Sequence, residues 1–120
     1  MLKKLDQAGY KIAIISSNSE DNIKEFLKAE GIDCIEDVFS STSLFGKDKV
    51  INKFLNKHQV DASEVIYVGD EERDIISCKK IGVDVIWVSW GFDLLEVARK
   101  HEPDYIVNQP SEILEIVKQI

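Results

Sequence analysis

Four carboxylates within five residues form the densest group of ionisable side chains in the sequence. They follow Gly69, at the end of the β-branched run 65–68, and are Asp70, Glu71, Glu72 and Asp74. Asp70 would project from the strand end and Asp74 would lie one helical turn further on, so both could converge on a hard cation such as Mg²⁺. A second interpretation is that Asp70 only caps the following helix, while the other acids favour its positive end.

Two further positions could bind an anion. Ser16, Ser17 and Asn18 follow an apolar run and precede a helical pattern. Their hydroxyl and amide groups, together with the N–H groups of the helix start, could cradle a phosphate. Plain helix capping is the alternative. Lys47 stands at a loop-to-helix boundary, where the helix dipole disfavours a cation. It therefore suggests a phosphate contact, with a solvated surface lysine as the alternative.

The remaining residues with chemical potential receive structural interpretations. Trp90 and Phe92 follow the apolar run 85–88. We expect both aromatic side chains to pack in the core. His58 and His101 stand near predicted helix ends in polar surroundings, and we assign them no chemistry.

The elements that position these side chains alternate along the chain. Strand patterns occur at residues 10–15, 35–39, 65–68, 85–88 and 105–107, and helical patterns at 2–9, 20–30, 47–57, 75–82, 94–98 and after Ser111 as N-cap. This alternation predicts an α/β fold, a three-layer sandwich with a mostly parallel, Rossmann-like sheet. Ligands of such sheets bind at the carboxyl ends of the strands, where the polar groups stand.

Length, charge and cysteine usage limit the class of protein. The 120 residues, 44% hydrophobic and 31% charged, predict one domain over residues 1–120. A net charge of −7 argues against a nucleic-acid partner. The apolar runs fall short of the roughly 18 residues that a membrane span needs, and the amino end lacks a secretory pattern. Cys34 and Cys78 have no metal-binding spacing, so we expect reduced thiols and a cytoplasmic location.

The order of the polar groups resembles that of the haloacid dehalogenase superfamily of phosphatases, in its phosphoglycolate phosphatase-like branch. The family's second motif matches Ile-Ser-Ser-Asn at 15–18, its third Gly-Lys at 46–47, and its fourth Gly-Asp-Glu-Glu-Arg-Asp at 69–74. The segment Val-Ser-Trp-Gly-Phe at 88–92 resembles what commonly follows. The resemblance covers essentially the whole chain.

The resemblance implies a Mg²⁺-dependent phosphomonoester hydrolase that acts on a small phosphorylated metabolite by in-line attack. Ser16 would hydrogen-bond the phosphoryl oxygens, and Lys47 would neutralise their charge and help to position the nucleophile. Asp70 would bind Mg²⁺, with Asp74 as a second ligand or as support for the first. Such positioning and electrostatic stabilisation account for most of the catalysis of phosphoryl transfer.

The first motif of that family is missing. In the family it is an Asp-x-Asp pair after an amino-terminal strand, which supplies the nucleophile and the general acid-base, but this chain contains no Asp-x-Asp. The specificity-setting cap between the first two motifs is absent as well. We therefore expect a haloacid dehalogenase-like core that lacks its first, central strand and is inactive alone.

A missing central strand would leave two strands with bare edges. Unpaired buried backbone groups cost about 1–3 kcal/mol each. We therefore expect the flanking strands to pair directly, a strand of another chain or of a homodimer to fill the slot, or the chain to be part of a longer protein. The alternative function is a non-catalytic phosphate- and Mg²⁺-binding module for regulation or oligomerisation. A receiver domain is disfavoured, because residues 16–18 lack the acidic pair it needs.

Overall fold

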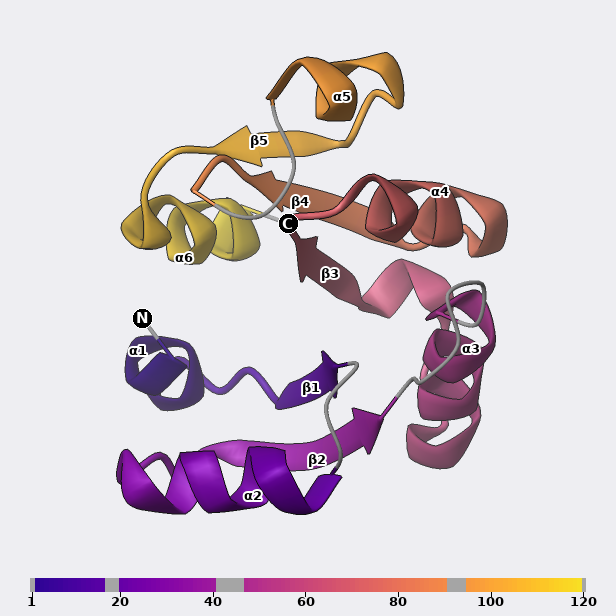
Figure 1. Cartoon of the computed structure of the whole chain (residues 1–120). Helices are drawn as coiled ribbons and strands as arrows, with labels where there is room; N and C mark the ends of the chain where they lie inside the picture. Colours follow the sequence, from indigo (N-terminus) through magenta and orange to yellow (C-terminus); the bar gives the residue numbers. More distant parts are fainter. Residues whose placement is uncertain (1, 17–19, 41–46, 91–94, 120) are drawn as a thin grey trace. The chain divides into compact units, whose positions relative to one another are not determined.

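The computed structural model describes residues 2–16, 20–40, 47–90 and 95–119, in which helices and strands alternate (Figure 1). This confirms the α/β class. The chain divides into two compact units, Met1–Gly46 and Lys47–Ile120. A single domain over the whole length stays a prediction. Within the described ranges, every helix is too short or too polar to cross a membrane.

The first unit pairs two parallel strands under a helix. Its described elements are α1 (Leu2–Gln7), β1 (Ile12–Ser16), α2 (Glu20–Ala29) and β2 (Ile35–Ser40). The ladder between β1 and β2 ends with Ser16 opposite Ser40. α2 lies along this small sheet (Figure 1), and its Ile23 and Leu27 form a buried cluster with Val38 of β2.

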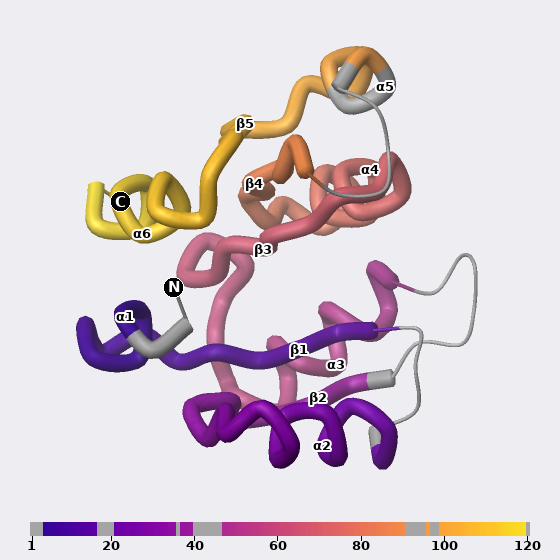
Figure 2. Tube along the Cα trace, turned by 60° about the vertical axis from the view of Figure 1, so that its left-hand side comes forward, coloured from indigo at the N-terminus to yellow at the C-terminus, as the bar shows by residue number. Residues whose placement is uncertain are grey.

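The second unit is a three-stranded parallel sheet between helices. Its described elements are α3 (Lys47–His58), the 3₁₀ turn η1 (Ala62–Glu64), β3 (Ile66–Gly69), α4 (Glu72–Ile81), β4 (Asp84–Val88), α5 (Leu95–Lys100), β5 (Tyr105–Val107) and α6 (Pro110–Gln119). The strand order is β3-β4-β5. α4 and α6 lie on opposite sides of this sheet (Figure 2), which gives the predicted helix–sheet–helix layers.

β4 forms the centre of the core of this unit. Val85, Ile86 and Trp87 are all 0% exposed, as expected for a strand with helices on both faces. Ile86 and Val88 pack with Ile113 of α6. Successive side chains of a strand point to opposite faces, so Val85 and Trp87 face the other side, where α4 contacts β4. β3 pairs with this buried strand, which positions its carboxyl end within the unit.

Two details of the elements differ from the sequence patterns. α6 begins at Pro110, so Ser111 lies inside the first turn and is not the N-cap. Proline is favoured at the first helical position because its missing N–H would have no helical partner there. Residues 59–64, between the helical pattern 47–57 and the strand pattern 65–68, contain the turn η1. Both differences concern single turns and leave the order of the elements as predicted.

Each unit has its own parallel sheet in the part of the chain that the structure describes. One contains β1 and β2, the other β3, β4 and β5, with no ladder joining them there. The three outcomes expected for a missing central strand, direct pairing of β1 with β3 among them, stay predictions. A core that lacks its first strand agrees with this arrangement.

Candidate active site

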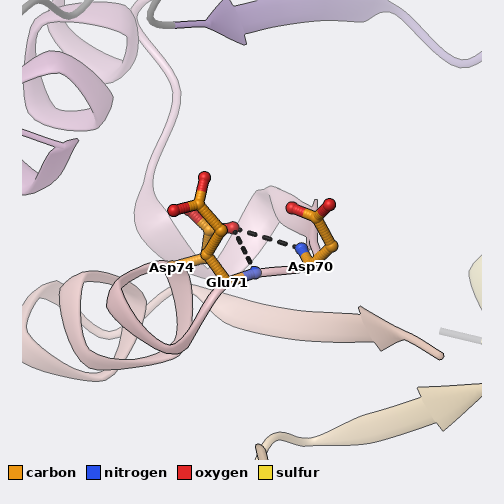
Figure 3. Close-up of side chains that lie close together, drawn as sticks. All are labelled: Asp70, Glu71 and Asp74. Atoms are coloured by element: carbon orange, nitrogen blue, oxygen red, sulfur yellow. Dashed lines mark hydrogen bonds between the residues drawn. The ribbon is translucent and has the colours of Figure 1, made fainter. Parts of the chain in front are cut away.

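Asp74, in the first turn of α4, is the centre of a polar cluster at the carboxyl end of β3. It is 2% exposed. Its Oδ2 accepts the backbone N–H groups of Asp70 at 3.2 Å and of Glu71 at 3.1 Å (Figure 3). Its Oδ1 accepts hydrogen bonds from Lys47 Nζ and, at 3.4 Å, from the Tyr67 hydroxyl. A carboxylate offers about four lone-pair sites, so these donors satisfy both oxygens.

Gly69 provides the space for this carboxylate. A Cβ atom at residue 69 would lie 2.5 Å from Oδ2 and 2.8 Å from Cγ of Asp74. Both distances are far below van der Waals contact, so any larger residue would displace Asp74. The glycine before the acidic group is therefore explained by the close approach of the Asp74 side chain to the backbone.

Lys47, the first residue of α3, is the buried cation of the cluster. It is 8% exposed. Its Nζ forms an ion pair with Asp74 and lies 3.9 Å from Glu71 Oε1. It also lies 6.0 Å from the centre of the Tyr67 ring. These contacts compensate for the unfavourable helix dipole at this position. The alternative of a solvated surface lysine is wrong.

The N-cap of α4 is Glu71, so the interpretation of Asp70 as a mere helix cap is also wrong. Arg73 pairs with the Glu71 side chain, with Nε 2.8 Å from Oε2 and Nη2 3.1 Å from Oε1. This hydrogen bonding raises the pKa of Arg73. The pair holds the Glu71 carboxylate at the edge of the cluster.

The acidic side chains fit a small, hard cation. One carboxylate oxygen each from Asp70, Glu71 and Asp74 can be chosen so that all lie within 4.8 Å of one another. Asp70 and Glu71 are half-buried, on the turn between β3 and α4 (Figure 3). Mg²⁺ commonly takes one or two such carboxylates and completes its shell with water. The donor set therefore agrees with the predicted magnesium site.

Two groups beside Asp74 retain their protons. Burial, followed by the charge of Asp74, raises the pKa of Tyr67 well above its usual range. The same causes raise the pKa of the Cys78 thiol to about 12. Tyr67 is therefore a hydrogen-bond donor at neutral pH. Sequence reasoning missed it, and its only signal is a hydroxyl in the otherwise apolar run before Gly69.

The anion-binding residues predicted around Ser16 belong to the first unit. Ser16 is the last residue of β1 and is half-buried. Ser17 and Asn18 lie outside the described residues. Binding of an anion by these three side chains stays a prediction.

Other side chains after the strands differ from expectation. Trp90 is 48% exposed, so its predicted role in the core is wrong, and Phe92 lies outside the described residues. His101, to which the sequence gives no chemistry, lies just after α5 with its Nε2 2.5 Å from Glu72 Oε1. This contact connects the end of α5 to the start of α4.

The fold and the site together define a class, a Rossmann-like α/β protein with a buried lysine–carboxylate pair beside an acidic cluster at a strand end. A family model described as haloacid dehalogenase-like hydrolase matches residues 1–88. The chain belongs to the haloacid dehalogenase-like hydrolase family, and the resemblance found in its motifs is confirmed.

Individual relatives confirm the phosphoglycolate phosphatase-like branch. The chain is 29% identical to a phosphoglycolate phosphatase of Synechococcus elongatus, with 100% of this chain and 57% of the relative covered. It is 31% identical to a phosphoglycolate phosphatase of Vibrio parahaemolyticus, with 97% and 53% covered. A solved putative phosphatase of Clostridium difficile matches with a TM-score of 0.87 at 32% identity, over 96% of this chain and 56% of that one. The chain thus spans a little over half the length of these relatives.

Proposed function

We propose that the chain is the Mg²⁺-binding part of the core of a phosphomonoester hydrolase for a small phosphorylated metabolite. The main support is the buried ion pair of Lys47 with Asp74, placed beside the carboxylates of Asp70 and Glu71. A cation fixed next to hard metal ligands is suited to the negative charge of a transferring phosphoryl group. The phosphatases among its relatives support the same class.

Each residue of the cluster has a part in this proposal. Asp70 holds the metal, and Asp74 supports the site, because both Asp74 oxygens already accept hydrogen bonds from protein donors. A bound Mg²⁺ would supply positive charge to the phosphoryl oxygens. Lys47 neutralises further charge from a position that Asp74 fixes. Ser16, in the first unit, retains its proposed role as a hydrogen-bond donor to phosphate.

The chain alone is proposed to lack turnover. It contains no Asp-x-Asp to serve as nucleophile and general acid-base. A second copy of the chain has the same sequence and could not supply the pair. An extended segment from elsewhere in a longer protein, or from another chain, is therefore the proposed complement. In the described residues, β3 pairs on one edge only, with β4, and its Val68 is 43% exposed.

Hydrolysis of para-nitrophenyl phosphate with Mg²⁺ tests this function. We expect no turnover from the chain alone, and turnover when it is fused to a strand with an Asp-x-Asp pair. Asp70→Asn should abolish the activity of the fusion, whereas Asp84→Asn, at an exposed position at the start of β4, should retain it. Turnover by the chain alone that Asp70→Asn abolishes would contradict the account of the missing nucleophile.

The second candidate is a non-catalytic module that binds Mg²⁺ and phosphate for regulation or oligomerisation. The absence of an Asp-x-Asp pair favours it. Calorimetry with Mg²⁺ and inorganic phosphate distinguishes the candidates when combined with the assay. Binding without turnover, even in the fusion, would favour the module. No heat and no rise in melting temperature would count against both.

A cytoplasmic location, with neither a membrane nor a nucleic acid as partner, completes the proposal. Both cysteines are free thiols, which suits a reducing compartment. The net charge of −7 would repel a phosphate backbone. Fractionation of the cells that express the chain would test the location directly.

A further inference from the structure

We propose that Tyr67 is a positioning residue, which holds the Asp74 carboxylate and, through it, the ammonium group of Lys47 in the orientation that receives a phosphoryl group. This inference rests on the proposed function and names a residue that the family motifs do not include. It starts from the four donors around Asp74. The two backbone N–H groups on Oδ2 follow from the turn into α4, and Lys47 is the partner in charge. Neither role accounts for the tyrosine hydroxyl.

The location of Tyr67 lets it act on both members of the ion pair. It lies on β3, opposite Val85 of β4, so its backbone is fixed by the sheet. Its hydroxyl donates to Oδ1 of Asp74, the same oxygen that accepts from Lys47. The Lys47 ammonium lies 6.0 Å from the centre of its ring, at the outer limit of a cation–π contact. One side chain thus restricts the carboxylate by hydrogen bonding and the ammonium by its ring.

The hydroxyl is costly unless it has such a role. A phenylalanine would fill nearly the same space on β3 without a polar atom, whereas the partly buried Tyr67 hydroxyl needs a partner to offset the water that it loses. The long, flexible side chain of lysine gains direction only from fixed partners. Since two donors share one Asp74 oxygen, loss of the hydroxyl leaves the ammonium free to move around that oxygen.

Inorganic phosphate, titrated by calorimetry with Mg²⁺ present, tests the proposal on the chain as it is. We expect Tyr67→Phe to weaken phosphate binding about fivefold, the size of one ordinary hydrogen bond. Tyr105→Phe is the control, because this β5 side chain packs against the buried cluster of Ile86, Val88, Val107 and Ile113. It should leave phosphate binding unchanged. In a Lys47→Gln background, Tyr67→Phe should cause no further loss, because the tyrosine acts through the lysine. An equal loss in both backgrounds, or no loss in either, would overturn the proposal.

A second measurement keeps this test independent of the proposed function. The ¹H–¹³C signals of the Lys47 side chain report its surroundings whether or not phosphate binds. We expect Tyr67→Phe to shift and sharpen them and Tyr105→Phe to leave them in place. If the chain binds neither phosphate nor Mg²⁺, the proposed function fails, and these signals still decide whether Tyr67 positions Lys47. Unchanged Lys47 signals in Tyr67→Phe would refute the positioning role.

Discussion

The ion pair of Lys47 with Asp74 is the single contact of the site on which stability should depend most. Their side chains are 10% and 2% exposed. Removal of Lys47 leaves the buried Asp74 charge without its cation, with only hydrogen-bond donors around it. We therefore expect Lys47→Ala to lower the free energy of unfolding by about 3 kcal/mol, measured by urea denaturation at pH 7.

An ion pair whose lysine is exposed provides the control for that substitution. Lys80 Nζ lies 3.3 Å from Asp48, with the lysine side chain 70% and the aspartate side chain 14% exposed. Water and salt screen the exposed lysine, so Lys80→Ala should lower the free energy of unfolding by much less than Lys47→Ala. Equal losses in the two variants would show that burial does not increase the contribution of the Lys47 ion pair to the free energy of unfolding.

The Cys78 thiol should make the stability of the protein depend on pH. Burial, and then the charge of Asp74, raise its pKa to about 12, against about 8.5 in an unfolded chain. The native state therefore retains this proton while the unfolded state loses it, so stability should fall as pH rises from about 9 to about 12. Urea denaturation between pH 8 and 11 should show this fall, and Cys78→Ala should reduce it. A slope that Cys78→Ala leaves unchanged would assign the effect to other groups.

The sequence predicted which charged residues belong to the site but not that two of them, Lys47 and Asp74, are buried. Asp70, Asp74 and Lys47 are polar side chains at strand and helix ends, a position that the pattern alone reveals. The burial of Lys47 depends on a partner 27 residues away, and no local pattern encodes such a contact. Tyr67 was not predicted as a site residue, because a tyrosine in an apolar strand usually belongs to the core.

At the scale of elements, the strands of the second unit were predictable because their β-branched runs are buried on both faces. Val85 and Ile86 are both 0% exposed. A continuous β-branched run is typical of a parallel strand that helices cover on both faces. Element ends were less predictable. Capping competes with neighbouring residues within one turn, as at Ser111 and Pro110. The exposure of Trp90 depends on what lies beside it after β4, which no local pattern indicates.

The edge of β2 supports a prediction about association. The Val38 N–H donates to the side chain of its neighbour Asp37 at 2.9 Å, and the ladder with β1 is irregular between Ile12 and Ala13. Carboxylates and bulges on an edge strand prevent it from pairing with another chain. Asp37→Val should therefore increase self-association, measured by light scattering over a range of concentrations. Asp33→Val, in the loop before β2, is the control, and equal association of both variants would contradict this role of Asp37.

At the scale of the whole molecule, the two units bury their cores to different depths. In the second unit, Ile75 and Trp87 are 0% exposed, whereas Ile23 and Val38 of the first unit are each 8% exposed. β1 is half-buried at each of its five positions although its sequence is almost entirely apolar. An apolar strand of this kind gains stability only when both its faces and its edges are covered.

This difference predicts the order in which the units open. Amide hydrogens exchange through local opening, whose free energy rises with the buried apolar contacts that must separate. We expect the amides of β4 to exchange slowest and those of β1 at least tenfold faster, a gap of about 1.4 kcal/mol in opening free energy, measured by NMR at pH 7 and 25 °C. Fusion to a strand that pairs with β1 should narrow the gap without slowing β4. Equal protection of β1 and β4 in the chain alone would mean that β1 is already covered and that the proposed complement is not needed for its stability.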